Sequence, residues 1–497
     1  MHLASLVEMV ESGFDDRALL GTRHRPITGA DFGRLVRRAA STLGEVDSLV
    51  YAGENHPLLP VALFGAAWAG IPFVPVNYRL EDTQLNELIA RQPSGRVLAD
   101  DTTAPRIDAP LAAMRFDEWL GCLPDDDPAI DPPFDDDEVA VVLFTSGTTS
   151  APKSALLRHR HLMAYLLGSV EFGGAADDEA VLVAVPPYHV AGVANMLSNL
   201  FAGRRLVYLN AFDPAVWLET VRAEQVTNAM VVPTMLARIV ASLDGEPADV
   251  PTLRSLSYGG ARVPERVLLD ALQAFPDTGF VNAYGLTETA STIAVLGPDD
   301  HRAALDASDP AGRRRLSSAG RVLPTIEIEI RDDAGAALPA GQTGMIHLRG
   351  EQISGEYATG SVLDEDGWFC TRDRGWIDDE GYLFIEGRAD DTIIRGGENI
   401  APAEIEEVLL SHPDVVQACV VGLPDNEWGQ RIAAAVVLAE RATASEDDLR
   451  QRVRQRLRGS KTPDTIEFRT ALPHTETGKM LRRVVQQELA DQRPGPG

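Results

Sequence analysis

The sequence predicts an α/β fold: a large multi-layer N-terminal domain with parallel sheets and a small β subdomain, then a small α+β C-terminal domain. Three observations predict it. Short apolar runs rich in β-branched residues alternate with helical segments from Ser48 to Ala283, an order typical of parallel sheets. Strands of period two follow from about Thr325. The length of 497 residues is also too great for one core.

The first 60 residues should form a helix, a hairpin and a second helix that begins after Thr28, a residue of N-cap type. The longest uncharged run, 57–76, contains prolines and is short for a membrane span, so we expect a buried helix and a strand there. The expected strands are 48–52, 71–76, 96–99, 138–144, 181–185, 205–208, 229–232, 255–258 and 280–283, and the expected helices include 57–69, 80–90, 159–171, 214–224 and 264–274.

The sequence pattern changes in the second half of the chain. The segments 326–331 and 344–348 alternate like strands of a small β subdomain. Residues 368–399 are dense in turn and charged residues, which indicates a domain boundary. Beyond it, the expected elements of a compact α+β module are a helix at 401–411 that starts with Pro402, strands at 415–421, 432–438 and 465–468, and a helix at 446–458.

Composition narrows the function. The net charge of −29 argues against nucleic acid or anionic membrane as a partner. The three cysteines, Cys122, Cys370 and Cys419, are scattered and odd in number, which is typical of a reducing cytoplasm and favours neither a disulfide framework nor a cysteine metal site. Acidic residues interrupt the N-terminal segment, so we expect no signal peptide, no stable membrane insertion and a cytoplasmic location.

One loop has the composition of a phosphate site. After the strand at 138–144, the chain reads Thr-Ser-Gly-Thr-Thr-Ser-Ala-Pro-Lys from Thr145 to Lys153. Gly147 lets the backbone approach a ligand, the hydroxyls donate to phosphate oxygens, and Lys153 adds charge. A Ser/Thr-rich surface turn is the alternative, and the loop lacks the Gly-Lys-Ser/Thr end of a Walker motif.

Five motifs, which follow one another in order along the chain, decide between a phosphate-binding loop and a surface turn. They are the Thr145–Lys153 loop, Tyr284–Thr289 (Tyr-Gly-Leu-Thr-Glu-Thr), Thr371–Asp373, Gly387–Asp391 and Pro473–Lys479. With them the chain resembles, over nearly its whole length, the adenylate-forming superfamily of acyl-CoA synthetases, peptide-synthetase adenylation domains and luciferases. It looks most like a fatty- or aryl-acid CoA ligase. Taken singly, each residue also fits an ordinary role in a core, a cap or a turn, and their joint order favours the functional one.

The resemblance implies an ATP and Mg²⁺ site. Tyr284 would stack on adenine, Thr287 would contact the α-phosphate, and Glu288 would bind Mg²⁺, a hard cation suited to carboxylates. Arg372 stands where the family has glycine, so the local backbone shape is an open question; Ser150 and Ser154 also replace glycines. Asn282 would hydrogen-bond adenine beside Tyr284, and Gly259, Gly260 and Ala261 would lie between adenine and the acyl pocket. The remaining implied contacts are Thr145, Ser146, Gly147, Thr148, Thr149 and Lys153 with the β- and γ-phosphates, Gly285 with the nucleotide, and Asp373 and Arg388 with the ribose.

The implied chemistry is attack of a carboxylate on the α-phosphorus of ATP, then thiol attack on the acyl-adenylate. The carboxylate is already ionised at pH 7, so positioning and electrostatics dominate. Lys479 would bridge carboxylate and α-phosphate. In relatives the C-terminal domain rotates between the two steps, which implies domains at 1–388 and 392–497, a hinge at 389–391 centred on Asp390, and a pantetheine tunnel lined by Gly396 and Gly397.

The acceptor and the acid are less sharply defined. Trp428 resembles an aromatic that stacks on the CoA adenine, and Arg79 a contact to its 3′-phosphate, but the basic cluster near Lys461 is thin. We expect CoA, with a carrier-protein phosphopantetheine as the alternative acceptor and a non-catalytic nucleotide-binding scaffold as a second alternative.

For the acid, His189 resembles a gate beside the carboxylate pocket, and residues 188–195 contain no aspartate for an amine. Met196, Val232, Met235 and Ala261 suggest an apolar pocket. We therefore expect a fatty, aromatic or alicyclic monocarboxylate. A homo-oligomer is left open, and Lys479 resembles sites that a lysine acetyltransferase modifies, which would remove its charge.

Overall fold

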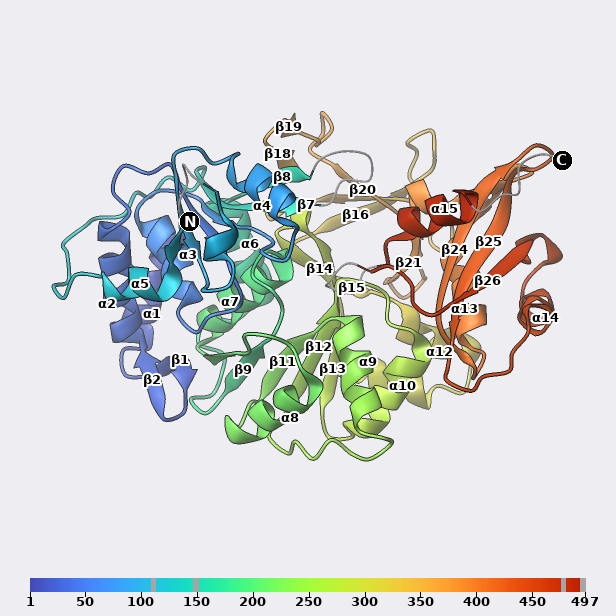
Figure 1. Cartoon of the computed structure of the whole chain (residues 1–497), viewed down its shortest axis with the longest axis horizontal. Helices are drawn as coiled ribbons and strands as arrows, with labels where there is room; N and C mark the ends of the chain where they lie inside the picture. The colour runs from blue at the N-terminus through green and yellow to red at the C-terminus, as the bar shows by residue number, and fades with distance from the viewer. Residues whose placement is uncertain (109–112, 146–151, 475–479, 492–497) are drawn as a thin grey trace.

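Two mixed β-sheets carry most of the chain, and a three-stranded sheet lies at its C-terminal end (Figure 1). The computed structural model describes residues 1–108, 113–145, 152–474 and 480–491. The architecture is α/β with a large N-terminal part and a small C-terminal module, as the sequence predicts. Most predicted elements lie within a few residues of their expected positions.

The smaller of the two mixed sheets holds the strand that precedes the phosphate loop. Its central strands β3, β4, β5 and β7 run parallel, as predicted, and β8 returns antiparallel beside β7. In spatial order the eight strands are β19 (Gly360–Ser361), β18 (Glu356–Tyr357), β8 (Lys153–Arg158), β7 (Val139–Thr145), β4 (Phe73–Pro75), β3 (Ser48–Ala52), β5 (Gly95–Ala99) and β6 (Met114–Arg115).

The larger sheet has thirteen strands, and its middle section is parallel. The segment predicted as a small β subdomain forms the antiparallel half of this sheet rather than a sheet of its own. The spatial order is β16 (Glu327–Arg331), β17 (Gly344–Arg349), β20 (Phe369–Ile377), β21 (Tyr382–Arg388), β15 (Gly320–Val322), β14 (Ser291–Leu296), β13 (Gly279–Leu286), β12 (Ser255–Gly259), β11 (Asn228–Val231), β9 (Ala180–Val183), β10 (Arg205–Tyr208), β1 (Ala18–Thr22) and β2 (Arg25–Thr28).

Helices join the two sheets through one core. α3 is buried along its whole length, and its side chains belong to the same hydrophobic cluster as Tyr51 of the smaller sheet and Val181 of the larger. Thr28 caps α2 by accepting a hydrogen bond from the Asp31 amide, as predicted. The helices of the N-terminal part are α1 (Leu3–Gly13), α2 (Gly29–Ser41), α3 (Leu59–Trp68), α4 (Asp82–Ile89), α5 (Phe116–Gly121), α6 (His159–Ser169), α7 (Val190–Ala202), α8 (Pro214–Ala223), α9 (Pro233–Ser242), α10 (Glu265–Ala274), α11 (Pro298–Asp306) and α12 (Pro310–Arg314).

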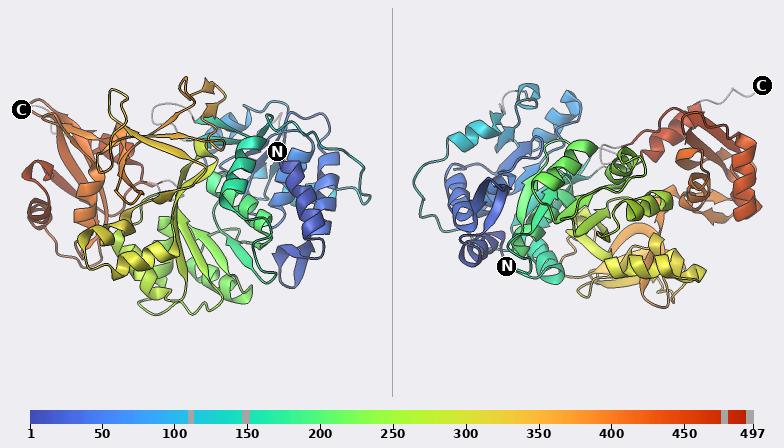
Figure 2. Two further views of the ribbon diagram at one scale, coloured as in Figure 1. Left: turned by 180° about the vertical axis from the view of Figure 1, so that it is seen from behind. Right: turned by 90° about the horizontal axis from the view of Figure 1, so that it is seen from below.

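The C-terminal module follows the hairpin β22 (Ile393–Arg395) and β23 (Glu398–Ile400). Its sheet of β24 (Val415–Asp425), β25 (Gly429–Leu438) and β26 (Thr465–Arg469) packs with α13 (Pro402–Leu410) and α14 (Glu446–Arg456) around its own core. α15 (Arg482–Asp491) is a helix that we did not predict, although Val485 and Leu489, four residues apart, bury its apolar stripe. The two further views show the module at one end of the molecule (Figure 2).

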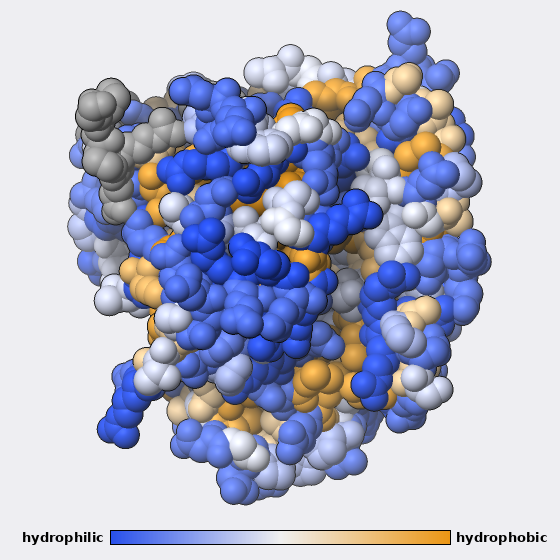
Figure 3. All heavy atoms as spheres, turned by 90° about the vertical axis from the view of Figure 1, so that its right-hand side faces the viewer, coloured by the Kyte–Doolittle hydropathy of each residue, from blue (hydrophilic) through white to orange (hydrophobic). Residues whose placement is uncertain are grey.

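The surface agrees with the acidic composition. The face at the C-terminal end is largely hydrophilic, with hydrophobic side chains in separate patches (Figure 3). None of the helices in the described ranges combines the length and apolar character needed to cross a bilayer.

Two buried histidines, His2 and His159, connect the start of α1 with the start of α6. The His2 and His159 rings lie with centroids 3.5 Å apart and are tilted by 31°, and His159 Nδ1 accepts a hydrogen bond from the Leu3 amide at 3.3 Å. Burial lowers the pKa of His2 to about 4 and that of His159 to about 3, although the carboxylate of Asp136 nearby acts in the opposite direction. Both rings are therefore neutral acceptors in the folded protein.

We predict that stability falls as the pH decreases below about 6.5, because the unfolded histidines then bind protons that the folded ones do not. His159→Asn keeps an acceptor that cannot titrate. It should reduce the loss of unfolding free energy between pH 7 and pH 4 by about 1–3 kcal/mol. Urea unfolding at several pH values measures this, with the exposed His24→Asn as control. An unchanged pH dependence in His159→Asn would contradict the assignment.

Candidate active site

A buried carboxylate lies where β20 and β21 pair. Asp373 is 5% exposed; its Oδ1 lies 3.0 Å from Arg388 Nε, and its Oδ2 accepts a hydrogen bond from the Tyr284 hydroxyl. Burial, followed by the charge of Asp373, holds the pKa of Tyr284 well above its ordinary value, so the phenol stays a neutral donor. The structure thus brings together three of the residues predicted to hold adenosine.

The structure defines the backbone conformation at Arg372, which the sequence left open. It has φ +60°, in the left-handed region that glycine favours. The backbone therefore keeps a glycine-like conformation despite the side chain, and the Asp373 amide donates to Thr371 Oγ1 at 3.0 Å. The Arg372 guanidinium lies 4.0 Å from the Asp390 carboxylate, and both groups are largely exposed.

Glycines allow close backbone approach between β12 and β13 and between β13 and β14. A Cβ on Gly259 would lie 2.3 Å from the Ala283 carbonyl oxygen, and one on Gly285 only 1.9 Å from that of Ser291. Gly285 sits at the irregular pairing of β13 with β14. Asn282, which we expected beside adenine, donates its amide to the Ser318 carbonyl at 3.0 Å. Gly260 and Ala261 follow β12 on exposed backbone.

At the predicted phosphate end, the structure brings together three groups, one of which was not predicted. Glu288 lies in the short 3₁₀ turn Thr287–Thr289, and Tyr357 of β18 donates its hydroxyl to Glu288 Oε1. Lys153, at the start of β8, holds its ammonium 5.2 Å from the centre of the Tyr357 ring. The predicted phosphate-loop residues Ser146, Gly147, Thr148 and Thr149 lie outside the described residues, as does Lys479; Thr145 ends β7.

His189 precedes α7 and stays uncharged. Burial lowers its pKa to about 4, so the ring is neutral at pH 7. Its ring lies 4.5 Å from that of Tyr188, which makes an edge contact with Tyr78 at 5.9 Å. Met196, Val232 and Met235, predicted to line the acyl pocket, are all buried.

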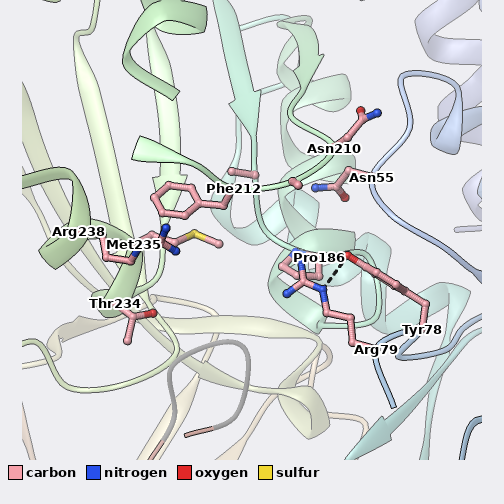
Figure 4. A pocket seen from close by; sticks show the side chains of 11 residues that line it. Asn55, Tyr78, Arg79, Pro186, Asn210, Phe212, Thr234, Met235 and Arg238 are labelled. Carbon is pink, nitrogen blue, oxygen red and sulfur yellow. Dashed lines mark hydrogen bonds between the residues drawn. The ribbon is translucent and has the colours of Figure 1, made fainter. Parts of the chain in front are cut away.

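A cavity of about 130 Å³ opens beside the ends of β9, β10 and β11 (Figure 4). Arg79 lines it, and its Nε donates to the Tyr78 hydroxyl at 3.0 Å. Arg238 lies on the other side with its guanidinium 5.1 Å from the centre of the Phe212 ring. The cavity also meets Asn55, Pro186, Asn210 and Met235, so two arginines and several polar side chains surround it.

Trp428 packs on the glycine turn of the C-terminal module. The Gly396 amide donates to the Trp428 carbonyl at 2.8 Å, and a Cβ on Gly396 would lie 3.0 Å from the indole. Gly396 and Gly397 both have positive φ, and the indole is 48% exposed. The Lys461 ammonium is paired with Glu404, so the thin basic cluster is also partly neutralised.

Comparison with known families identifies the chain. The profile of the AMP-binding enzyme family matches residues 8–358, and that of the AMP-binding enzyme C-terminal domain matches residues 404–479. The chain belongs to the AMP-binding enzyme family.

Similar proteins act on carboxylic acids. This AMP-binding enzyme is 34% identical over 478 residues to a feruloyl-CoA synthase of Amycolatopsis, covering 93% of this chain and 94% of the relative. It is 33% identical to the fatty acid–[acyl-carrier-protein] ligase ScoC of Streptomyces coeruleorubidus, covering 89% and 87%. The o-succinylbenzoate CoA synthetase MenE of Bacillus subtilis, solved with its acyl-adenylate, is 25% identical with a TM-score of 0.85 over 99% of both chains. The predicted superfamily is confirmed.

The residues present fit Mg²⁺ and ATP. Mg²⁺ is usually held by one or two carboxylates together with substrate phosphates and water, and Glu288 supplies one carboxylate near Lys153. Within the described ranges, no group of three or more acidic, histidine or cysteine side chains forms a metal cage. MenE has also been solved with ATP and a magnesium ion, at a TM-score of 0.82.

Sequence reasoning missed Tyr357 and Arg238. Tyr357 falls outside the motifs that carried the resemblance, and only the pairing of β18 with β8 places it beside Glu288 and Lys153. Arg238 looks like any exposed arginine on an amphipathic helix. No local signal distinguishes either residue, because both depend on elements distant in sequence.

We predict that Asp373→Asn weakens ATP binding, because an amide compensates the Arg388 charge poorly and cannot accept equally at both atoms. The unfolding free energy should fall by about 1–3 kcal/mol. Calorimetric ATP titration and chemical unfolding measure the two effects. Asp300→Asn is the matched control, since Asp300 accepts the Tyr382 hydroxyl at 2.6 Å. It should lose stability only; equal ATP affinity in both variants would remove Asp373 from the nucleotide site.

Proposed function

We propose that this AMP-binding enzyme converts an apolar, most often aromatic, carboxylic acid to its acyl-CoA through an acyl-adenylate, releasing AMP and pyrophosphate. ATP, Mg²⁺, CoA and the acid are its small-molecule partners. The observation that carries the proposal is the pairing of an adenosine site (Tyr284, Asp373, Arg388) with a separate phosphate and metal site (Lys153, Glu288).

The two ends would position the α-phosphorus between them. Asp373 and Arg388 offer an acceptor and a donor to the ribose hydroxyls, while Lys153 offers a cation to the phosphates. Mg²⁺, when bound, neutralises phosphate charge as a Lewis acid. No residue need act as a base, since the attacking carboxylate is ionised. His189 is neutral and adds no competing charge beside that carboxylate.

Lys479 is the proposed bridge between the carboxylate and the α-phosphate, a role that rests on the motif Pro473–Lys479. Acetylation of Lys479 and a homo-oligomer stay predictions. Residues 389–391 are the proposed hinge between 1–388 and 392–497. In support, β21 ends at Arg388 and a short 3₁₀ turn, Ala389–Asp391, leads into the module. A cytoplasmic location is supported by the three free cysteines.

CoA is the proposed acceptor. Two features would receive its nucleotide: the indole of Trp428, exposed beside Gly396, and the cavity with Arg79 and Arg238. A carrier-protein phosphopantetheine is the alternative, favoured by the Lys461–Glu404 pair, which weakens the attraction for the CoA phosphates, and by the likeness to ScoC. Trp428 lies on the module and Arg79 follows β4, so the two features come from the two parts that the proposed hinge joins.

The proposed class of carboxylic acid follows from the burial and the lack of charge of the side chains expected to line its pocket. The buried, apolar side chains of Met196 and Val232 offer no partner for an amine or a second carboxylate. The feruloyl-CoA synthase relative acts on an aromatic acid by its name. A fatty or alicyclic acid would fit the same apolar lining.

We predict that AMP is released over many turnovers from ATP and Mg²⁺ only when both a suitable acid and CoA are present, whereas pyrophosphate forms with the acid alone. The panel should contain hydroxycinnamic, arylacetic, fatty and amino acids, with aromatic acids the most active and amino acids inactive. Acid-dependent pyrophosphate exchange without CoA isolates the first step. Turnover only with a carrier protein would favour the alternative acceptor, and no exchange with any acid would favour the scaffold.

We predict that Arg79→Ala raises the KM for CoA and leaves the KM for dephospho-CoA nearly unchanged, because the guanidinium is assigned to the 3′-phosphate. Losing one charged hydrogen bond corresponds to about 1.5–3 kcal/mol. Steady-state kinetics with both thiols measures the difference. Arg115→Ala is the control, an exposed arginine 3.4 Å from Asp101 in a different region. Equal effects on the two thiols would remove Arg79 from the 3′-phosphate site.

A further inference from the structure

Residues 352–358 connect the two parts of the proposed phosphate site. On one side, Tyr357 pairs with Ala155 of β8, and the Ala358 amide donates to the Ser154 carbonyl at 2.9 Å. On the other side, the Ser354 and Gly355 amides donate to the Glu288 carbonyl at 2.8 and 3.1 Å. The segment therefore holds the strand that begins at Lys153 against the turn that carries Glu288.

Side chains reinforce this connection. Gln352 Nε2 donates to the carbonyls of Thr289 and Thr292, each at 2.9 Å. Glu356 accepts a two-point ion pair from Arg158 of β8, with N–O distances of 2.6 and 2.7 Å. Such a fork is rigid, so the position of Tyr357 between them is well determined.

Tyr357 touches both functional groups at once. Its hydroxyl donates to Glu288 Oε1, and its ring lies under the Lys153 ammonium at 5.2 Å. Glu288 can then use Oε2 and the remaining lone pair of Oε1 for another partner.

We propose that Tyr357 is a positioning residue for the phosphate and metal site: its hydroxyl orients Glu288 toward Mg²⁺ and its ring holds Lys153 toward the phosphates. The inference rests on the proposed roles of Glu288 and Lys153. The hydrogen bond fixes the carboxylate rotamer before the metal arrives, and the cation–π contact keeps the ammonium from pairing with that carboxylate. Partners of this kind typically change metal affinity about 10- to 100-fold when they are removed.

Two substitutions separate the two contacts. Tyr357→Phe removes the hydroxyl and keeps the ring, whereas Tyr357→Leu removes both. Tyr382→Phe is the matched control: Tyr382 donates its hydroxyl to Asp300 at 2.6 Å, outside the site. The first measurement is equilibrium binding of ATP to each protein by calorimetry, without metal and over a series of free Mg²⁺ concentrations. The second is the unfolding midpoint without ligand.

Tyr357→Phe should raise the Mg²⁺ concentration that half-maximally strengthens ATP binding by about 10- to 100-fold. Its metal-free ATP affinity should stay close to that of the wild type, because the ring still supports Lys153. Tyr357→Leu should lose metal-free affinity as well. Tyr382→Phe should change neither quantity. In a Glu288→Gln background, Tyr357→Phe should have little further effect on the Mg²⁺ dependence, because the two residues act together.

A purely structural role predicts a different pattern, in which the unfolding midpoint falls and the Mg²⁺ dependence does not move. The proposal is overturned if Tyr357→Phe keeps the Mg²⁺ dependence of the Tyr382→Phe control, or if its effect adds fully to that of Glu288→Gln. These outcomes are distinct from failure of the proposed function, in which the wild-type protein itself would bind ATP without any Mg²⁺ dependence or would not bind it.

Discussion

The arrangement of the site depends on how the buried carboxylate of Asp373 is compensated by its neighbours. A carboxylate with so little exposure needs charge and hydrogen-bond compensation. Arg388 and Tyr284 provide it from two other strands, β21 and β13 of the same sheet. The compensation therefore fixes three strands relative to one another. Arg388 is also the last residue of β21, directly before the short turn Ala389–Asp391. A nucleotide that contacted this ion pair would contact the start of the proposed hinge.

Local contacts between neighbouring groups also explain how an acidic chain can bind a polyanion. With a net charge of −29, long-range attraction cannot bring phosphate to the surface. Local cations must act at short range, where solvent screening is weak. Lys153 stacked over Tyr357 and Arg388 paired with Asp373 are held by neighbours rather than left as free surface charges. The charge of Arg388 is already partly balanced by Asp373, which limits how tightly this arginine could hold a product.

Sequence reasoning reached the fold class and many element bounds because periodicity and capping are local. Thr28 and the strand at Ser48–Ala52 were located from a few neighbouring residues. It predicted no strands in 368–399, where charged, turn-rich composition concealed β20 and β21, whose charged residues pair across the sheet or face solvent. The domain boundary expected in this segment stays a prediction. For the site, motif order predicted the grouping of Tyr284, Asp373 and Arg388. It could not find Tyr357, whose role arises from strand pairing across about 200 residues.

The choice of acceptor depends on which basic side chains could meet the phosphates of CoA. On the module, Lys461 pairs with Glu404 and Arg395 with Asp464, the latter at 2.7 Å. A CoA phosphate there would have to compete with carboxylates already in place. On the N-terminal side, the Arg79 guanidinium donates to the Tyr78 hydroxyl, the Arg238 guanidinium lies over the Phe212 ring, and both arginines line one cavity. This cavity would offer two guanidinium groups to an anionic end of the acceptor, while the exposed Trp428 would contribute stacking, an interaction that needs no charge. If both features bind CoA, the N-terminal part would recognise the phosphates and the part proposed to move would recognise the base.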